Sequence, residues 1–189
     1  MESHVMVAIE TASASSDAAL ISIAAVEFNP NDRGAGNNFY EVVSLASSIN
    51  AGGTMSPETI KWWMKQNPEV SQECWNNPNE SDLESVLIDF NSWLSEFKDL
   101  VLWANPPSFD ITIIESAMRR LKMKPCWYSS RLMDLRTLRI LAWGIDRKKE
   151  AWEGDAIPDK KMQHNALYDA TRQCAMAQQC LSKLNIEVL

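Results

Sequence analysis

The sequence has no apolar run that approaches the roughly 18 residues a membrane-spanning helix needs. Its N-terminus also lacks the basic stretch followed by apolar residues that marks a secretory signal. We therefore expect a cytoplasmic protein with no membrane partner. The chain has 189 residues, of which 46% are hydrophobic and 23% charged, and this composition favours a single domain over residues 1–189 with one sizeable core.

Zinc-binding and disulfide patterns are missing as well. The four cysteines are scattered along the chain without a C-x-x-C pair, at Cys74, Cys126, Cys174 and Cys180. This spacing argues against both a structural zinc site and a disulfide framework. We expect these cysteines to be reduced and partly buried.

The chain also lacks the overall positive charge typical of proteins that bind long nucleic acids, because its net charge is -7. The charge is uneven, however. Residues 1–118 carry 4 Lys and Arg against 17 Asp and Glu, whereas residues 119–161 carry 12 against 6. The basic segment is either a solvated surface or a patch that follows phosphates beside an acidic pocket. The second interpretation favours a short stretch of nucleic acid held at one end over a long duplex.

The order of the expected elements indicates the fold class. Three β-rich runs come first, at residues 4–9, 18–28 and 37–45. Ser56 and Pro57 form the start of a helix that Asn67-Pro68 closes, and a capping box at residues 81–84 opens another. A strand is then expected at 100–104, helices at 108–121, 133–143 and 166–184, and an irregular loop at 144–162. This order predicts an α/β fold in which a mixed sheet is flanked by helices.

Two carboxylates follow strands in this scheme. Glu10 comes directly after the apolar run at residues 5–9, and a Thr-Ala-Ser turn follows it. Side chains two apart on a strand share a face, so positions 8 and 10 point toward one pocket. Asp110 stands at the start of a helix after the strand at 100–104, where a carboxylate also complements the helix dipole without any catalytic role.

His164 and Asp169 are five residues apart near the C-terminal helix. Positions i and i+5 do not share a helix face, so we place His164 at the junction of loop and helix and Asp169 inside the helix. An imidazole in that place can accept a proton from an attacking water while the carboxylate holds a metal ion. A structural or surface role is the alternative for His164 taken alone.

Together, Glu10, Asp110, His164 and Asp169 resemble the ordered motifs of DEDDh-type 3'-5' exonucleases, which have a ribonuclease H-like fold. The resemblance covers residues 5–184. The segments SPETIKWWMKQ and MDLRTL resemble the ribonuclease T-like branch, which is related to mycobacterial and phage exoribonucleases. The resemblance to DEDDh-type exonucleases implies that Glu10, Asp110 and Asp169 hold Mg²⁺ or Mn²⁺ and that His164 is the general base.

The same resemblance implies a set of substrate-binding residues. Thr11, Ala12 and Ser13 would line the sugar and the 3'-hydroxyl of the terminal nucleotide, and Phe109 belongs to an aromatic-aspartate pair typical of the family. Trp62 or Trp63 would stack on a base, and helical neighbours about 100° apart cannot both do so. Arg136 would support the pocket or a phosphate, or pair with Asp134.

The sequence departs from the family at Ala8, where the pattern has its first aspartate. Ala8 indicates either a natural pseudo-nuclease or the deliberate removal of one ligand from an active enzyme. We favour the second, since the other expected residues are all in place. The predicted function is a metal-dependent 3'-5' exonuclease on single-stranded RNA or DNA 3' ends, impaired in this chain but still able to bind nucleic acid.

Two other functions fit the same residues. One is a non-catalytic nucleic-acid end-binding or adaptor protein on the same fold, and the other is a phosphodiesterase that acts on dinucleotides. Ribonuclease T-like relatives pair so that the basic patch of one subunit serves the active site of the other, so the resemblance also implies a possible homodimer. The choice between RNA and DNA stays open, because no motif reports contacts to a 2'-hydroxyl.

Overall fold

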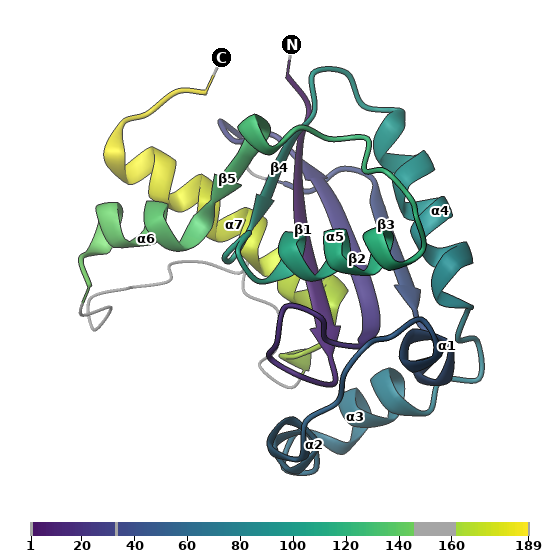
Figure 1. The fold of residues 1–189 in the computed structure, drawn as a ribbon. Helices are drawn as coiled ribbons and strands as arrows, with labels where there is room; N and C mark the ends of the chain where they lie inside the picture. The colour runs from purple at the N-terminus through teal and green to yellow at the C-terminus, as the bar shows by residue number, and fades with distance from the viewer. Residues whose placement is uncertain (1, 33, 146–161, 189) are drawn as a thin grey trace.

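The computed structural model describes residues 2–32, 34–145 and 162–188. Within them, a mixed five-stranded sheet has the order β3-β2-β1-β4-β5 and is flanked by seven α-helices (Figure 1). The strands are β1 His4–Thr11, β2 Leu20–Phe28, β3 Asn38–Val42, β4 Val101–Ala104 and β5 Leu132–Asp134. The predicted α/β fold, a ribonuclease H-like mixed sheet flanked by helices, is confirmed.

The central strand of the sheet is β1. It pairs antiparallel with β2 and parallel with β4, while β2 pairs antiparallel with β3 and β4 pairs parallel with β5. The register of β1 against β2 shifts between Glu10 and Thr11, which is a bulge at the end of the strand. Bulges are frequent beside active sites because they redirect a side chain where the pairing ends.

The helices cover both faces and one end of the sheet. They are α1 Leu45–Asn50, α2 Pro57–Trp63, α3 Pro68–Trp75, α4 Leu83–Ser95, α5 Asp110–Arg120, α6 Leu135–Trp143 and α7 Ala166–Leu184. In Figure 1, α6 and α7 lie on one face, α4 and α5 lie on the other, and α1, α2 and α3 gather where β1 ends.

The alternation of β1 side chains produces these two faces. Val5, Val7 and Ile9 pack into the core formed with α4 and α5. Met6 and Ala8 pack into the core formed with α6 and α7. Position 10 continues the second set, so β1 directs Glu10 toward the face on which α7 lies.

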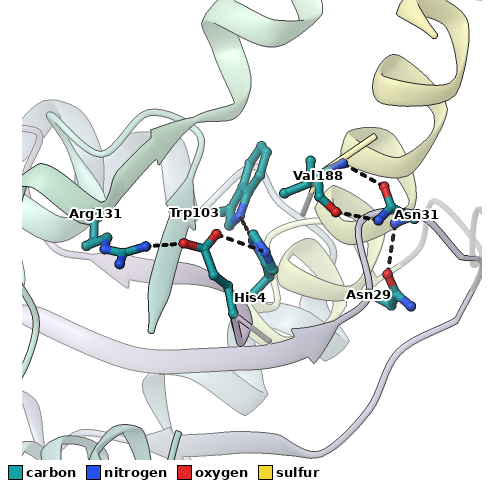
Figure 2. A network of polar contacts seen from close by, with 7 residues as sticks. His4, Asn29, Asn31, Trp103, Arg131 and Val188 are labelled. Carbon is teal, nitrogen blue, oxygen red and sulfur yellow. Dashed lines mark hydrogen bonds and ion pairs between the residues drawn. The ribbon is translucent and has the colours of Figure 1, made fainter. Parts of the chain in front are cut away.

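The start of β1 is anchored at the opposite end from Glu10. Trp103 Nε1 donates a hydrogen bond to His4 Nδ1 at 3.0 Å, and Glu2 pairs with Arg131 while it lies 4.0 Å from His4 Nε2 (Figure 2). Burial lowers the pKa of His4, and the charge of Glu2 opposes this shift. His4 is therefore a structural histidine, distant in the strand from the acidic end.

Several boundaries differ from the sequence prediction. Helices α1 and α3 were not predicted, and Leu45 begins α1 instead of ending a strand. Met133 and Asp134 belong to β5, where Asp134 caps α6 by accepting hydrogen bonds from the backbone of Arg136 and Thr137. A strand of three residues has no measurable period, so the sequence predicts only the helix that follows it.

One of the two predicted helix caps agrees with the structure and the other is displaced by one residue. Ser56 caps α2 as predicted, since its side chain accepts from the Thr59 backbone N–H. The cap of α4 is Asp82 instead of Ser81. Most of the loop expected at 144–162 lies outside the described residues. Among the described residues, no helix is long and apolar enough to cross a membrane.

Candidate active site

Glu10 lies at the bulged end of β1, in the sheet's central strand. Its pKa is raised well above the ordinary value, first by burial and then by the negative charges of Asp169 and Asp110. Two carboxylates from remote parts of the chain therefore act on Glu10 electrostatically. Such mutual repulsion in a buried place favours a bound cation or a bound proton.

His164 and Asp169 lie at the start of α7. His164 precedes the helix, and Asp169 lies in its first turn, so the predicted division between junction and helix is confirmed. The backbone N–H of His164 donates to Asp169 Oδ2 at 3.3 Å. His164 has a φ of 75°, in the left-handed region that few side chains adopt, and this conformation turns the chain sharply into α7.

Asp110 is the first residue of α5, and it is buried. Its Oδ1 accepts a hydrogen bond from the backbone N–H of Ile9 at 3.2 Å, so it is tied to β1 beside Glu10. Burial raises the pKa of Asp110 to about 7, against the opposing effects of the Ile9 hydrogen bond and the charge of Arg136.

Three of the predicted residues form a compact group. Ligand atoms of Glu10, His164 and Asp169 all lie within 4.8 Å of one another, and this is the group within the described residues that could hold a metal ion. Asp110 stands outside this group, although its charge acts on Glu10.

The donor set fits a divalent cation. Asp169 Oδ1 is buried and has no hydrogen-bond partner among the described residues. Burial raises the pKa of Asp169, while the charges of Arg172 and His164 lower it. A buried carboxylate oxygen without a partner, beside a second carboxylate and an imidazole, is the environment in which a hard cation replaces missing hydrogen bonds.

Ala8 lies on the same strand face as Glu10, and only 3% of its surface is exposed. It packs into the apolar core with residues of α7, among them Ala166 and Ala170. Position 8 thus points toward the helix that carries Asp169. An aspartate at position 8 would therefore point toward the same pocket, whereas the methyl group of Ala8 supplies no ligand.

The two tryptophans of α2 have different surroundings. Trp63 is 3% exposed and donates its Nε1 hydrogen to the Thr11 carbonyl at 3.1 Å, so it belongs to the core and cannot stack on a base. Trp62 is 40% exposed, and its ring lies edge-on to the His164 ring at 4.6 Å between centroids. Trp62 is therefore the tryptophan of the pair beside the candidate site.

The turn after Glu10 presents little free side chain. Ala12 is fully buried, and Thr11 and Ser13 are buried as well. The Thr11 hydroxyl donates to the Ser13 carbonyl at 2.7 Å, and the Ser13 hydroxyl lies 2.9 Å from that of Ser15. Any contact of this turn with a sugar would therefore come from its backbone.

Phe109 and Arg136 are the remaining predicted substrate residues. Phe109 is partly buried and packs against the core between the sheet, α4 and α5. The side chain of Arg136 is exposed, and its charge lowers the pKa of Asp110. Asp134 contacts the backbone of Arg136, so the predicted side-chain pair between them is replaced by a helix cap.

Sequence reasoning missed Cys74 and Arg172. Cys74 of α3 lies close enough to Glu10 and Asp169 for their charges, together with burial, to raise its pKa. Arg172 lowers the pKa of Asp169 and His164. Arg172 follows Asp169 by one helical turn, a spacing that could have indicated it, whereas no local signal links Cys74 to the site.

The geometry agrees with a comparison of the whole chain with protein families. A family model described as the 3'-5' exoribonuclease Rv2179c-like domain matches residues 3–181. The chain belongs to this family. A search of curated protein sequences found no match.

Solved structures share the fold of this Rv2179c-like domain. One is E. coli exonuclease I in complex with a dT13 oligonucleotide, with a TM-score of 0.71, 12% identity, and coverage of 98% of this chain and 42% of that one. Another is the nuclease domain of 3'hExo, a DEDDh family member bound to rAMP, with a TM-score of 0.65, 12% identity, and coverage of 96% and 92%. The domain thus spans about two fifths of exonuclease I and nearly all of the 3'hExo nuclease domain.

The matching family is described as a 3'-5' exoribonuclease domain, and the chain shares its fold with the nuclease domain of a DEDDh family member. The family description and the folds of its neighbours support a nuclease, hence a hydrolase. DEDDh exonucleases generally use divalent metal ions, and the group of Glu10, His164 and Asp169 could hold one.

Proposed function

We propose that this domain has the fold and the site of a metal-dependent exonuclease. Such an enzyme removes nucleoside monophosphates from the 3' ends of single-stranded RNA or DNA. We propose further that Ala8 impairs hydrolysis in this chain while nucleic-acid binding is retained. One observation supports this proposal most directly. The ligand atoms of Glu10 on β1 and of His164 and Asp169 at the start of α7 all lie within 4.8 Å of one another.

The carboxylates have distinct tasks in this proposal. Glu10 and Asp169 would hold the divalent cations, and Asp110 would add its negative charge to the pocket from α5. When bound, Mg²⁺ or Mn²⁺ supplies a Lewis acid that stabilises the charge developing on the phosphodiester oxygens. Burial of these carboxylates raises their pKa values, so cation binding and deprotonation are coupled.

His164 accepts the proton of the attacking water. Burial lowers its pKa, with Arg172 acting in the same direction and Asp169 opposing it, so the imidazole is neutral and able to accept a proton at physiological pH. The exposed face of Trp62 stacks on the terminal base. Stacking is tolerant of sequence, as stepwise removal of any nucleotide requires.

Ala8 affects hydrolysis more than binding. A missing ligand weakens the metal site, and loss of one group that acts in the transition state lowers turnover by orders of magnitude. The stacking surface at Trp62 does not depend on position 8. Removal of one negative charge also lowers repulsion of the substrate phosphates.

The deciding experiment restores the aspartate. Ala8→Asp is compared with Ala8→Asn, which adds nearly the same volume without the charge, and with the chain as printed. Each is incubated with 3'-end-labelled single-stranded RNA, single-stranded DNA and overhanging duplexes, with Mg²⁺, Mn²⁺ or chelator. We expect nucleoside monophosphates from Ala8→Asp with metal only. An Ala8→Asp protein that is folded and binds metal yet releases none of them would contradict the proposal.

A non-catalytic end-binding protein is the second candidate, and the observation that favours it is Ala8 itself. It predicts tight binding of 3' ends by the printed chain and no activity in any variant at position 8. A dinucleotide phosphodiesterase would instead cleave dinucleotides and leave longer strands intact. Comparing dinucleotides with longer oligonucleotides in the same assay separates these functions.

A cytoplasmic location and a homodimer remain predictions. The basic segment at 119–161, which would serve the partner's site in a dimer, lies partly outside the described residues. Sedimentation velocity over a range of protein concentrations tests the dimer directly.

A further inference from the structure

The backbone around His164 is held from several elements at once. Its N–H donates to Asp169 Oδ2, and its carbonyl accepts a hydrogen bond from Cys74 Sγ at 3.7 Å. Its φ of 75° is unfavourable for a residue with a side chain, so neighbouring contacts must maintain it. The next residue, Asn165, is itself held by two hydrogen bonds of its side chain.

Both ends of the Asn165 side-chain amide are used. Its Oδ1 accepts from the backbone N–H of Tyr168 at 3.0 Å and so caps α7. Its Nδ2 donates to the hydroxyl of Tyr40 at 3.2 Å. Asn165 is buried, so this orientation of the amide satisfies both groups without water.

The Tyr40 hydroxyl continues the chain of hydrogen bonds. It donates to Glu73 Oε1 at 3.2 Å, and Asn77 Nδ2 donates to the same oxygen at 3.0 Å. The chain thus runs from a carboxylate on α3 through Tyr40 on β3 to the residue beside His164. Hydrogen bonds that end on a charged acceptor are stronger than neutral ones, and connected bonds polarise one another.

We infer that Tyr40, backed by Glu73, is a positioning residue for His164: it fixes Asn165 and thereby the place of the imidazole at the entrance of α7. The inference rests on the proposed function in giving His164 its role as general base. The hydrogen bonds of the Tyr40 hydroxyl within the described residues go to Glu73 and Asn165, and none joins it to Glu10, Asp110 or Asp169. It acts through Asn165, so its contribution is to geometry and not to chemistry.

Tyr40 is well suited to this task. Its ring is half-buried against the core shared with α6 and α7, and burial with the charge of Glu73 keeps its pKa above the usual range, so the hydroxyl remains a donor. Tyr40→Phe therefore removes the hydrogen bonds and leaves the packing of the ring. Tyr128, which is 76% exposed, offers the matched control Tyr128→Phe.

The first test uses the printed chain and observes the imidazole directly. The chain has only two histidines, so two sets of ring signals appear in an NMR spectrum and His164→Asn assigns them. The His164 signal depends on the Trp62 ring 4.6 Å away. We expect Tyr40→Phe to shift or broaden it and to leave the His4 signal in place, whereas Tyr128→Phe changes neither.

Two further variants separate positioning from capping. Asn165→Ser keeps a capping hydroxyl for α7 and loses the donor to Tyr40, so it should reproduce the His164 shift with helix content unchanged. Glu73→Gln keeps an acceptor for Tyr40 and should move the His164 signal less than Tyr40→Phe. These variants also keep the inference testable if Tyr40→Phe does not fold.

The second test measures turnover in the Ala8→Asp background. We expect Tyr40→Phe to lower kcat roughly 10-fold and to change KM less than about 2-fold, because a displaced base affects the transition state and not substrate binding. A His164 signal that Tyr40→Phe moves no more than Tyr128→Phe does would overturn the inference. An inactive Ala8→Asp protein would overturn the proposed function. The NMR experiment would still test whether Tyr40 positions His164.

Discussion

Ala8 changes the energetics of the acidic pocket as well as its chemistry. In a full set of four carboxylates, the buried negative charges repel one another until cations bind. With alanine at position 8, an apolar methyl group packs against α7, and one of these charges is gone. The chain as printed is therefore expected to be more stable without metal than an enzyme with the complete set.

The stability of the Ala8→Asp protein tests this account. A buried carboxylate without a partner costs about 2 kcal/mol, which corresponds to a Tm decrease of roughly 4–8 °C in chelator. Mn²⁺ should reverse the decrease, since a ligand that binds only the folded state stabilises it. Thermal unfolding with and without Mn²⁺ measures both effects, with Ala8→Asn as control. Equal Tm values for the two variants in chelator would contradict the expectation.

Asp110 makes the stability of the domain depend on pH, and the direction of its pKa shift gives the sign of this dependence. Its pKa is raised to about 7 in the folded chain, against roughly 3.9 for an exposed aspartate. Between these values the folded chain holds a proton that the unfolded chain has released, so stability falls as the pH rises. Without metal, we expect a loss of roughly 2–3 kcal/mol between pH 5 and 8 from this group.

Asp110→Asn isolates this contribution. The amide can still accept the hydrogen bond from Ile9, and it does not titrate in this range. The variant should therefore lose less stability between pH 5 and 8 than the printed chain, and Glu10 and Asp169 should account for the remaining dependence. Chemical denaturation at each pH in chelator provides the comparison, and parallel curves for the two proteins would rule out the role given to Asp110.

Helix α2 shows how two adjacent helical positions separate a core residue from one that lies beside the candidate site. Neighbouring positions are about 100° apart around a helix, so Trp63 enters the core while Trp62 faces the His164 side. The sequence shows that one of the two must be buried. It does not show which, because the answer depends on how α2 lies against the turn after β1.

Alanine substitutions should separate the two tryptophans. Trp63→Ala removes a buried ring and should cost about 3–5 kcal/mol of unfolding free energy. Trp62→Ala should cost little stability but weaken binding of a single-stranded oligonucleotide by about 1–3 kcal/mol, the value of one stacked base. Denaturation and fluorescence anisotropy in the Ala8 background measure these quantities. Unchanged affinity in folded Trp62→Ala would remove Trp62 from the binding site.

The charge of the whole chain limits how it can hold nucleic acid. A net charge of -7, with 17 acidic residues in residues 1–118, is incompatible with many phosphate contacts. An end-binding site needs few such contacts, and the exposed Arg136 beside Asp110 is placed to provide one. Affinity should therefore come mainly from stacking and end recognition.

The salt dependence of binding tests this view of the molecule. Three phosphate contacts on a single strand would give a slope of log K against log salt near -2. Arg136→Gln should reduce the magnitude of this slope by roughly 0.7, the value of one contact. Lys98→Gln, in the loop after α4, should leave the slope unchanged. Titrations at several salt concentrations give the slopes. A slope steeper than about -5 would indicate a long phosphate track.

Much of the architecture could be inferred from the printed residues. The apolar runs of β1, β2 and β4, the cap at Ser56 and the period of α7 are local signals that the sequence shows directly. The order of Glu10, Asp110, His164 and Asp169 also indicated the family. Helix α1 has no capping side chain and β5 has only three residues, so their local signals are weak. Asn67-Pro68 begins α3, where the sequence predicts the end of a helix.

The arrangement around the site could not be inferred in this way. Tyr40, Glu73 and Cys74 reach the His164 turn from elements separated from it by about half the chain or more, and nothing in the local sequence of any of them marks the contact. The period of apolar residues indicates which face of a strand or helix is buried. It does not indicate which residues of other elements pack against that face. That depends on long-range packing, and here packing brings α3 and β3 against the turn that carries His164.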